Sequence, residues 1–331
     1  MVKRIRTYLA WGSISTGLAF SLSVMAQQDN HLSQFNSSPM IVNPAMTGMF
    51  KGNYRAQLNY RTQWKSILKN PFINQVASFD MPRKKFGCGI IIQNNKAGSG
   101  NMKATSLALS CAYEVTSDPM EIHHLTTGLQ IGFINKSVDV SRLTFDNQYS
   151  SASASFDQNI SSQENFQSTS YFLPDINFGV YYYNTDKENK LNPYLGMSAF
   201  HLSVPKESFF GMNSRIPIRF LVHGGTKIKL SETIKIEPSL LYMQQTNVRE
   251  VNVGILGDCF IIEFNTHLQL GAFYRNKDAF IIQTAMAYKE YTLRMSYDIN
   301  TSSLSPFTQG KGGFEISIIY MKENGNYVPS F

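Results

Sequence analysis

Histidine and cysteine are the residues of this chain that could act as bases, nucleophiles or metal ligands, but their spacing favours none of these roles. The sequence contains no GxSxG, HExxH or glycine-rich phosphate-binding motif. Its cysteines form no CxxC pair, and their odd number argues against a disulfide framework. We therefore predict that the protein is not an enzyme and carries no cofactor or metal ion. The residues considered are His31, His123, His124, His201, His223, His267, Cys88, Cys111 and Cys259.

Polar side chains, several of them charged, instead recur at every second position within long apolar segments. In the segment 291–299, Tyr291, Leu293 and Met295 alternate with polar residues such as Arg294 and Asp298. Strict alternation over eight or more residues is typical of a β-sheet with one wet and one apolar face. The charged residues that the pattern places on wet faces are Arg55, Arg61, His223, Lys227, Lys229, Lys235, Glu237, Arg294 and Asp298.

The length of the alternating segments distinguishes a soluble sandwich from a membrane barrel. A sandwich uses strands of about 5–6 residues, whereas a transmembrane strand needs about 9–11. The segments here are long, many end in Tyr or Phe, and only 16% of the residues are charged. We predict an all-β fold, a transmembrane antiparallel up-and-down barrel of about 14 strands in the outer membrane. The expected strands lie near 53–63, 72–81, 86–96, 101–115, 122–138, 174–184, 191–201, 217–230, 233–245, 247–257, 261–275, 278–288, 290–299 and 312–321.

The sequence divides into four regions. Residues 1–26 combine basic residues, an apolar stretch and Val24-Met25-Ala26, which predicts a signal peptide for the Sec export pathway, cleaved after Ala26. Its removal takes away three basic and no acidic residues and lowers the formal charge from +7 to +4, too little to indicate nucleic-acid binding. Residues 27–52 lack alternation and are expected to form a periplasmic or luminal arm. Residues 53–321 then form the barrel, and residues 322–331 a tail.

The connection lengths predict how the barrel is oriented. If the first strand runs outward, every long connection lies outside, including 139–173 and 202–216. The first of these is rich in Ser, Asn and Gln, and a loop of this kind is either disordered or a binding surface. Fourteen strands enclose more space than side chains fill, so the lumen holds water, a plug or a partner. The charges on the wet faces either pair across strands or line a mildly basic chamber for a peptide or polymer.

The proposed arm and the first strand carry a recognisable motif. Its blocks are Ser33-Gln34-Phe35, Asn43-Pro44-Ala45 with Gly48, and Asn59-Tyr60-Arg61-Thr62-Gln63-Trp64, followed near the end by Gly312-Gly313-Phe314-Glu315-Ile316-Ser317. In these residues the chain resembles the PorP/SprF family of outer-membrane proteins of the type IX secretion system in Bacteroidetes. The resemblance spans essentially the whole mature chain.

The resemblance implies a role in secretion and cell-surface attachment rather than catalysis. It implies either a structural part of the secretion machine or a dedicated partner of one large secreted adhesin, often tied to gliding motility. In the second role the barrel would hold the C-terminal domain of the adhesin. The expected partners are this domain, periplasmic components of the machine, including peptidoglycan-linked ones, and outer-membrane lipid. A general porin or small-solute channel is the alternative on the grounds of the barrel alone.

The motif residues suggest specific structural roles. Trp64 is expected at the outer membrane interface, which favours an indole ring. Arg61 and Gln63 share the luminal face and could hydrogen-bond the arm, while Asn43-Pro44 and Gly48 indicate turns. Structural support of the arm and direct contact with cargo are both open for these residues. The candidate arm residues are Gln34, Phe35, Asn43, Pro44, Arg61, Gln63 and Trp64, and the candidate luminal partner-binding residues are Arg55, His223, Lys227, Lys229, Arg294 and Asp298.

Overall fold

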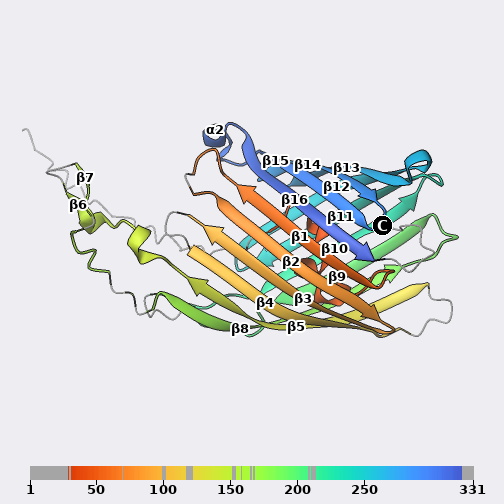
Figure 1. The fold of residues 1–331 in the computed structure, drawn as a ribbon, viewed down its shortest axis with the longest axis horizontal. Helices are drawn as coiled ribbons and strands as arrows, with labels where there is room; N and C mark the ends of the chain where they lie inside the picture. Colours follow the sequence, from red (N-terminus) through yellow and green to blue (C-terminus); the bar gives the residue numbers. More distant parts are fainter. Residues whose placement is uncertain are drawn as a thin grey trace, which may run out of the picture.

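Fourteen long strands form one closed antiparallel barrel in the computed structural model (Figure 1). The structure describes residues 29, 31–68, 70–98, 102–116, 122–150, 154–157, 159–164, 166, 168–207, 209 and 214–322. Each barrel strand pairs with its neighbours in the chain, and β1 closes the sheet against β16. The predicted architecture and strand number are therefore confirmed. The expected signal peptide, 1–26, and most of the expected tail lie outside the described residues.

The strands of the barrel and the shorter elements have the following bounds. The barrel strands are β1 (Tyr54–Gln63), β2 (Phe72–Arg83), β3 (Phe86–Ala97), β4 (Met102–Glu114), β5 (His123–Ser137), β8 (Ser170–Asn184), β9 (Leu191–Phe200), β10 (Arg219–Lys229), β11 (Ile234–Gln245), β12 (Val248–Ile261), β13 (Thr266–Arg275), β14 (Ala279–Tyr288), β15 (Tyr291–Asn300) and β16 (Lys311–Lys322). The helices are α1 (Pro39–Val42) and α2 (Ser305–Thr308), and the 3-10 turns are η1 (Phe35–Ser37), η2 (Pro44–Met46), η3 (Val140–Arg142), η4 (Asp146–Gln148) and η5 (Ile262–Phe264). A small hairpin joins β6 (Tyr149–Ser150) to β7 (Ser155–Phe156).

The alternation of polar and apolar residues sets which face of each strand lines the lumen. In β15, Arg294 and Asp298 are buried in the interior, whereas Tyr291 and Tyr297 are exposed on the outer surface. This arrangement places aliphatic and aromatic side chains around the outside of the barrel, where they suit a lipid environment. In the part of the chain that the structure describes, no helix has the length and hydrophobicity needed to cross a membrane.

Three strand boundaries differ from the prediction by four residues or more. β8 begins at Ser170 rather than near residue 174, because alternation continues ahead of Pro174, with Leu173 inside and Phe172 outside. β12 continues to Ile261, so the predicted turn at 258–260 is wrong. The chain reverses instead through η5 and Asn265, which adopts a left-handed conformation (φ 47°) that asparagine tolerates. β13 therefore begins at Thr266 rather than near residue 261.

The connection between β5 and β8 leaves the barrel as a long extension (Figure 1). Its described part carries η3, η4 and the β6–β7 hairpin. We call residues 138–169 the long outer loop. It lies at the same end of the barrel as the connection between β9 and β10. The other end carries short turns, including the exposed Arg83, Lys84 and Lys85 between β2 and β3.

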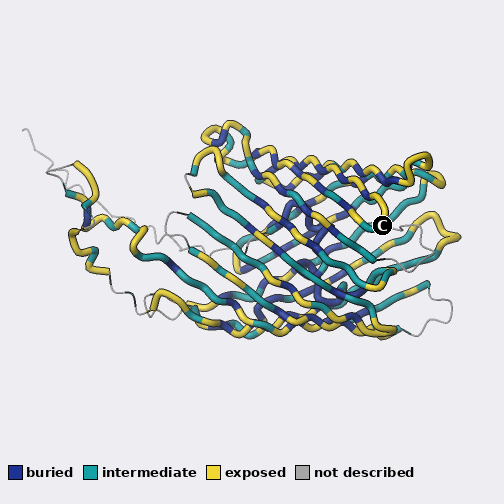
Figure 2. Tube along the Cα trace, in the orientation of Figure 1, coloured by how far each residue is buried: buried dark blue, intermediate teal, exposed yellow. Residues whose placement is uncertain are grey.

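The lumen is occupied by the N-terminal part of the described chain. Residues 31–48, which we call the arm, carry η1, α1 and η2 and are buried along most of their length inside the barrel wall (Figure 2). Leu32, Met40 and Ile41 of the arm pack against Val76 and Ile91 of the wall. The arm and the wall therefore form a common core. The inward-facing side chains of the wall alone would not fill a barrel of this width.

Candidate functional site

The arm runs along the lumen from one end of the barrel to the other. Asp29, just before the arm, lies at the end with the long loops, where its carboxylate is 2.5 Å from His201 Nε2 and 3.4 Å from Arg219 Nη1. Gly48 lies toward the opposite end, where its N–H donates to Asp80 Oδ2 at 2.8 Å. The chain then enters β1 at the end with the short turns. Asp29 therefore lies on the side that the loop lengths predict to be external.

The charges around Asp29 fix its ionisation state. Burial alone would raise the pKa of Asp29, but the positive charges of Arg219 and His201 outweigh it and hold that pKa well below its usual value. Burial likewise opposes the charge on His201, but the Asp29 and Asp175 carboxylates raise the pKa of His201 to about 9. At neutral pH the start of the arm is thus held by a charged Asp29–His201 pair.

The position of Asp29 predicts its accessibility from outside the cell. In a background with all three cysteines changed to serine, a cysteine placed at Asp29 should react with a membrane-impermeant maleimide on intact cells. Asp29 has a side chain that is 26% exposed. Arg142→Cys in the long outer loop should react in the same way, whereas Lys84→Cys should react only after the cells are permeabilised. Protection of Asp29→Cys on cells that label Arg142→Cys would contradict this path of the arm.

Two carboxylates and two guanidinium groups of the wall hold the beginning of the arm. We call Arg61, Arg275, Asp298 and Glu315 the ionic anchor. Asp298 Oδ2 lies 2.9 Å from Arg61 Nη2 and 2.7 Å from Arg275 Nη2, and it accepts a hydrogen bond from Ser33 Oγ at 2.7 Å. Glu315 accepts the backbone N–H of Ser33 at 2.7 Å. All four anchor side chains are buried, so each charge depends on these partners for its compensation.

Gln34 is held by the wall through both ends of its amide group. Its Nε2 donates to Ser296 Oγ at 3.2 Å and to the carbonyl oxygen of Glu315 at 3.1 Å. Its Oε1 accepts a hydrogen bond from Ser317 Oγ at 2.7 Å. Gln34 is completely buried, and an apolar replacement would leave these wall groups without their partner.

Asn43 fixes the other half of the arm. Its Oδ1 accepts the N–H of Ala45 at 2.9 Å and so caps η2, while its Nδ2 donates to the carbonyl oxygen of Val180 at 2.9 Å. The same Nδ2 lies 3.2 Å from His223 Nε2. Pro44 occupies the first position of η2, where a missing N–H costs nothing. This is the turn that the Asn-Pro pair indicated.

A row of small residues lets the arm approach the wall closely. Across five adjacent strands the register aligns Gly87, Ala112, Gly128, Gly179 and Ser198, and all five face the lumen. We call this row the small-residue shelf. A Cβ atom at Gly128 would overlap the backbone of Pro44 and Ala45, and one at Gly179 would overlap the Asn43 amide oxygen. These glycines are therefore required by the close contact between arm and wall.

The wall also satisfies the carbonyl groups that the arm cannot pair by itself. Gln130 Nε2 donates to Met40 O at 2.9 Å, and Ser198 Oγ donates to Val42 O at 2.6 Å. Thr126 Oγ1 donates to Ala45 O at 2.9 Å. The arm has little regular structure, so these contacts supply the hydrogen bonds that a buried backbone requires.

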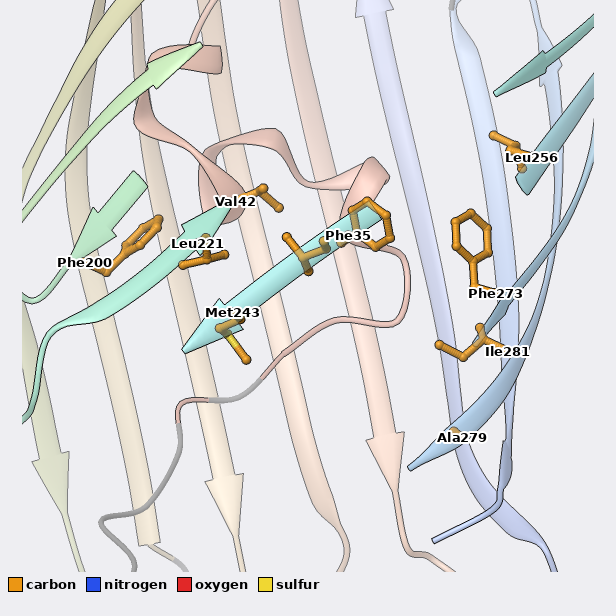
Figure 3. Close-up of a cluster of buried hydrophobic side chains, with 10 residues drawn as sticks. Phe35, Val42, Phe200, Leu221, Met243, Leu256, Phe273, Ala279 and Ile281 are labelled. Atoms are coloured by element: carbon orange, nitrogen blue, oxygen red, sulfur yellow. The ribbon is translucent and has the colours of Figure 1, made fainter. Parts of the chain in front are cut away.

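Apolar contacts fill the space between the polar anchors. Phe35 packs edge-to-face against Phe273 of β13, with 5.7 Å between ring centroids, and Val42 lies among side chains of β9, β10 and β11 (Figure 3). A cavity of about 20 Å³ remains beside Phe35 and Ile41, lined also by Leu221 and Met243. This volume holds roughly one water molecule. Beside Phe35 and Ile41 the side chains of the arm and the wall therefore leave room for little more than one water molecule.

The structure places the candidate residues of the sequence analysis in different settings. Gln34, Phe35, Asn43, Pro44 and Arg61 take part in the contacts between arm and wall, and Arg61 also donates to His31 O at 2.5 Å. Gln63 shares the luminal face of β1, and Trp64 lies at its outer end against Phe72.

The candidate luminal partner-binding residues make contacts within the protein. Asp298 and His223 contact the arm, Arg55 pairs with Asp80, and Arg294 donates to Gln269 Oε1 at 3.1 Å. Lys229 bonds Glu232 in a turn at the short-turn end, and Lys227 lies nearby on the same strand. The sequence left open whether the wet-face charges pair across strands or line a chamber. Arg55 and Asp298 form ion pairs within the wall, as the first interpretation expects.

Sequence reasoning missed several residues of this site. Ser33, Arg275, Glu315 and Asp80 carry the contacts at the two ends of the arm. Glu315 and Ser317 alternate with apolar residues in β16, and this signal could have placed them inside. Ser33 belongs to a motif block, but the sequence could not assign its role, because its partner Asp298 is 265 residues away in the chain.

These features define a class of protein: an outer-membrane β-barrel whose lumen is occupied by its own N-terminal arm. The chain matches the model of the type IX secretion system membrane protein PorP/SprF over residues 24–320, and it belongs to that family. No curated protein matches the chain.

Two solved structures with a similar fold are described as toluene transporters. The toluene transporter TodX of Pseudomonas putida has a TM-score of 0.54 and 8% identity, covering 90% of this chain and 96% of its own. The toluene transporter TbuX of Ralstonia pickettii has a TM-score of 0.53 and 11% identity, covering 87% and 93%. At such low identity the likeness concerns the fold alone.

Proposed function

We propose that the protein supports secretion and surface attachment of a large secreted protein, such as a gliding adhesin, by holding its C-terminal domain. Membership of the PorP/SprF family supports the role in secretion. One observation indicates where the secreted protein would bind: the arm occupies the lumen and contacts Asp298 and His223 there. A partner from outside is then held by the outer loops, rather than by the luminal charges.

The long outer loop has the features of a protein-binding surface. It projects beyond the barrel, and its hairpin presents Tyr149 and Phe156 as a directly opposed aromatic pair with 5.5 Å between ring centroids. Both rings are about half exposed, at 50% and 49%. Exposed aromatic side chains on a polar loop are typical of binding hot spots, where truncation costs 2 kcal/mol or more. This supports the loop as the main contact with the secreted partner.

Replacement of the aromatic pair should weaken capture of the partner. The double variant Tyr149→Ser, Phe156→Ser should recover at least about tenfold less secreted protein in pull-downs from solubilised outer membranes, since two hot-spot contacts are lost. The matched control is Ser150→Ala, Ser155→Ala, which changes the adjacent opposed pair of the same hairpin. Recovery that is unchanged by the aromatic replacement, and also by deletion of residues 143–166, would exclude the long outer loop as the grip.

A small-solute channel is the second candidate. The fold resembles those of proteins described as toluene transporters, which favours it. A channel needs an open path, and the arm occupies the lumen with the buried side chains of Phe35, Met40 and Asn43. A steady conductance of the intact protein in planar bilayers would favour the channel, and a silent barrel that co-purifies with a large secreted protein would favour the secretion partner.

A further inference from the structure

Two of the three cysteines face each other across neighbouring strands. Cys88 of β3 and Cys111 of β4 are directly opposed in the antiparallel register, and their Sγ atoms are 3.9 Å apart. Both side chains lie on the outer surface of the barrel. Cys259 of β12 also faces outward, but its cross-strand neighbours are Ile234 and Leu268. The sequence spacing gave no sign of the pair, because the 22 residues between Cys88 and Cys111 span a hairpin.

We propose that Cys88 and Cys111 form a disulfide, a covalent modification site in the wall of the barrel. The sheet already holds their Cβ atoms at cross-strand distance, about 4.5–5.5 Å, close to the 3.5–4.5 Å that a disulfide requires. The sulfur atoms can cover the remaining distance by rotation about the Cα–Cβ bonds. Register supplies the pairing, so the two thiols meet whenever β3 and β4 form their hairpin.

The reaction requires an oxidant that the export route supplies. A thiolate of one cysteine attacks a disulfide of a periplasmic thiol oxidant, which forms a mixed disulfide and releases one oxidant thiol. The second cysteine then attacks the mixed bond, which forms the Cys88–Cys111 bond and releases the other oxidant thiol. Two S–H bonds are lost and one S–S bond is made, and the two electrons and two protons reduce the oxidant disulfide to a dithiol. The periplasm is a compartment in which such bonds persist.

The position of the pair along the barrel fits access from the periplasm. Phe86 and Tyr113 form a ring pair on the same face, 4.9 Å between centroids, one step nearer to the short turns. Aromatic pairs of this kind mark the membrane interface. The thiols therefore lie just inside the interface on the periplasmic side, where the newly inserted hairpin meets a water-soluble oxidant.

The bond also lies on the outer face of the wall where the inner face contacts the arm. Gly87 and Ala112, which flank the two cysteines and pair with each other, belong to the small-residue shelf. A Cβ atom at Gly87 would overlap the carbonyl of Thr47, so the arm touches the wall at this point. A disulfide between Cys88 and Cys111 fixes the register of β3 and β4 directly behind that contact.

Thiol counting on the full-length protein tests the proposal. Outer membranes are quenched in acid without added oxidant, denatured and alkylated with N-ethylmaleimide, and the intact mass is measured before and after reduction. We expect one label before reduction, on Cys259, three after it, and a linked peptide containing Cys88 and Cys111. Three labels before reduction would overturn the proposal.

Single substitutions make the count specific to the pair. Cys88→Ser should raise the count before reduction to two, because Cys111 loses its partner. Cys259→Ser should lower it to none before reduction and leave two after it. Equal counts before reduction in Cys88→Ser and the parent protein would also overturn the proposal. Heat-modifiable migration of each variant on gels confirms that the barrel has folded.

Discussion

Deletion of residues 32–47 should open the lumen and give the barrel a steady conductance in planar bilayers that the parent protein lacks. The arm occupies the lumen with buried side chains, including Phe35, Met40 and Asn43, and the cavity beside Phe35 and Ile41 measures only about 20 Å³. The strands do not depend on the arm for their backbone hydrogen bonds, because the sheet closes on itself through β1 and β16. The barrel wall should therefore persist around a water-filled passage.

A point substitution on the wall provides a test that leaves the arm intact. Gly128→Val should displace the arm and raise conductance, because its side chain would overlap Pro44 and Ala45. Valine suits a strand, so the wall itself should tolerate the change. Gly257→Val is the matched control, since a Cβ atom there meets nothing closer than Leu270 O at 3.6 Å.

The conductance results separate two explanations of closure. A silent deletion variant that still inserts and migrates as a folded barrel would show that another part of the protein closes the lumen. A conducting parent protein would instead favour the small-solute channel over the proposed secretion partner. Silence of the parent together with conductance of both arm variants is the result that the contacts between arm and wall predict.

The barrel could be predicted from the sequence because its signal is local. The alternation in the segment 291–299 assigns Arg294 and Asp298 to one face and Tyr291 and Tyr297 to the other without any knowledge of neighbouring strands. The pattern misplaces a strand end where alternation continues past a residue that usually marks a boundary. Pro174 inside β8 is such a case, since the strand begins at Ser170.

The contacts of the arm could not be predicted because they join residues far apart in the chain. Considered separately in the sequence, Asn43 indicates a turn and Gly179 a residue that destabilises a strand. Their meaning appears only when the register brings Gly128 and Gly179 side by side under the arm. The same limit applied to Asp298, which the pattern placed in the lumen but could not assign to Ser33 rather than to a partner.

Neutralising Asp298 should loosen the beginning of the arm. In Asp298→Asn, Arg61 and Arg275 lose the carboxylate that lies within 2.9 Å of both guanidinium groups, and Ser33 Oγ loses a charged acceptor. Breaking a buried ion pair by removal of one partner costs about 3–5 kcal/mol. The Ser33 and Gln34 amides donate to Glu315 in the closed state, so their hydrogen exchange reports on the docking of the arm. Exchange in the peptide covering residues 31–47 should accelerate by roughly a hundredfold to a few thousandfold, since 1.4 kcal/mol corresponds to a factor of ten.

A matched substitution shows whether this effect comes from burial of the charge. Asp139→Asn removes the same carboxylate from an ion pair with Arg142, 3.0 Å long, in the long outer loop. That pair is exposed to solvent, where such contacts contribute little, so protection of the arm should not change. Faster exchange in Asp298→Asn alone, with protection of the strands β3 and β4 retained, would assign the loss to the ionic anchor. Equal protection in Asp298→Asn and the parent protein would mean that Glu315, Gln34 and Asn43 hold the arm without Asp298.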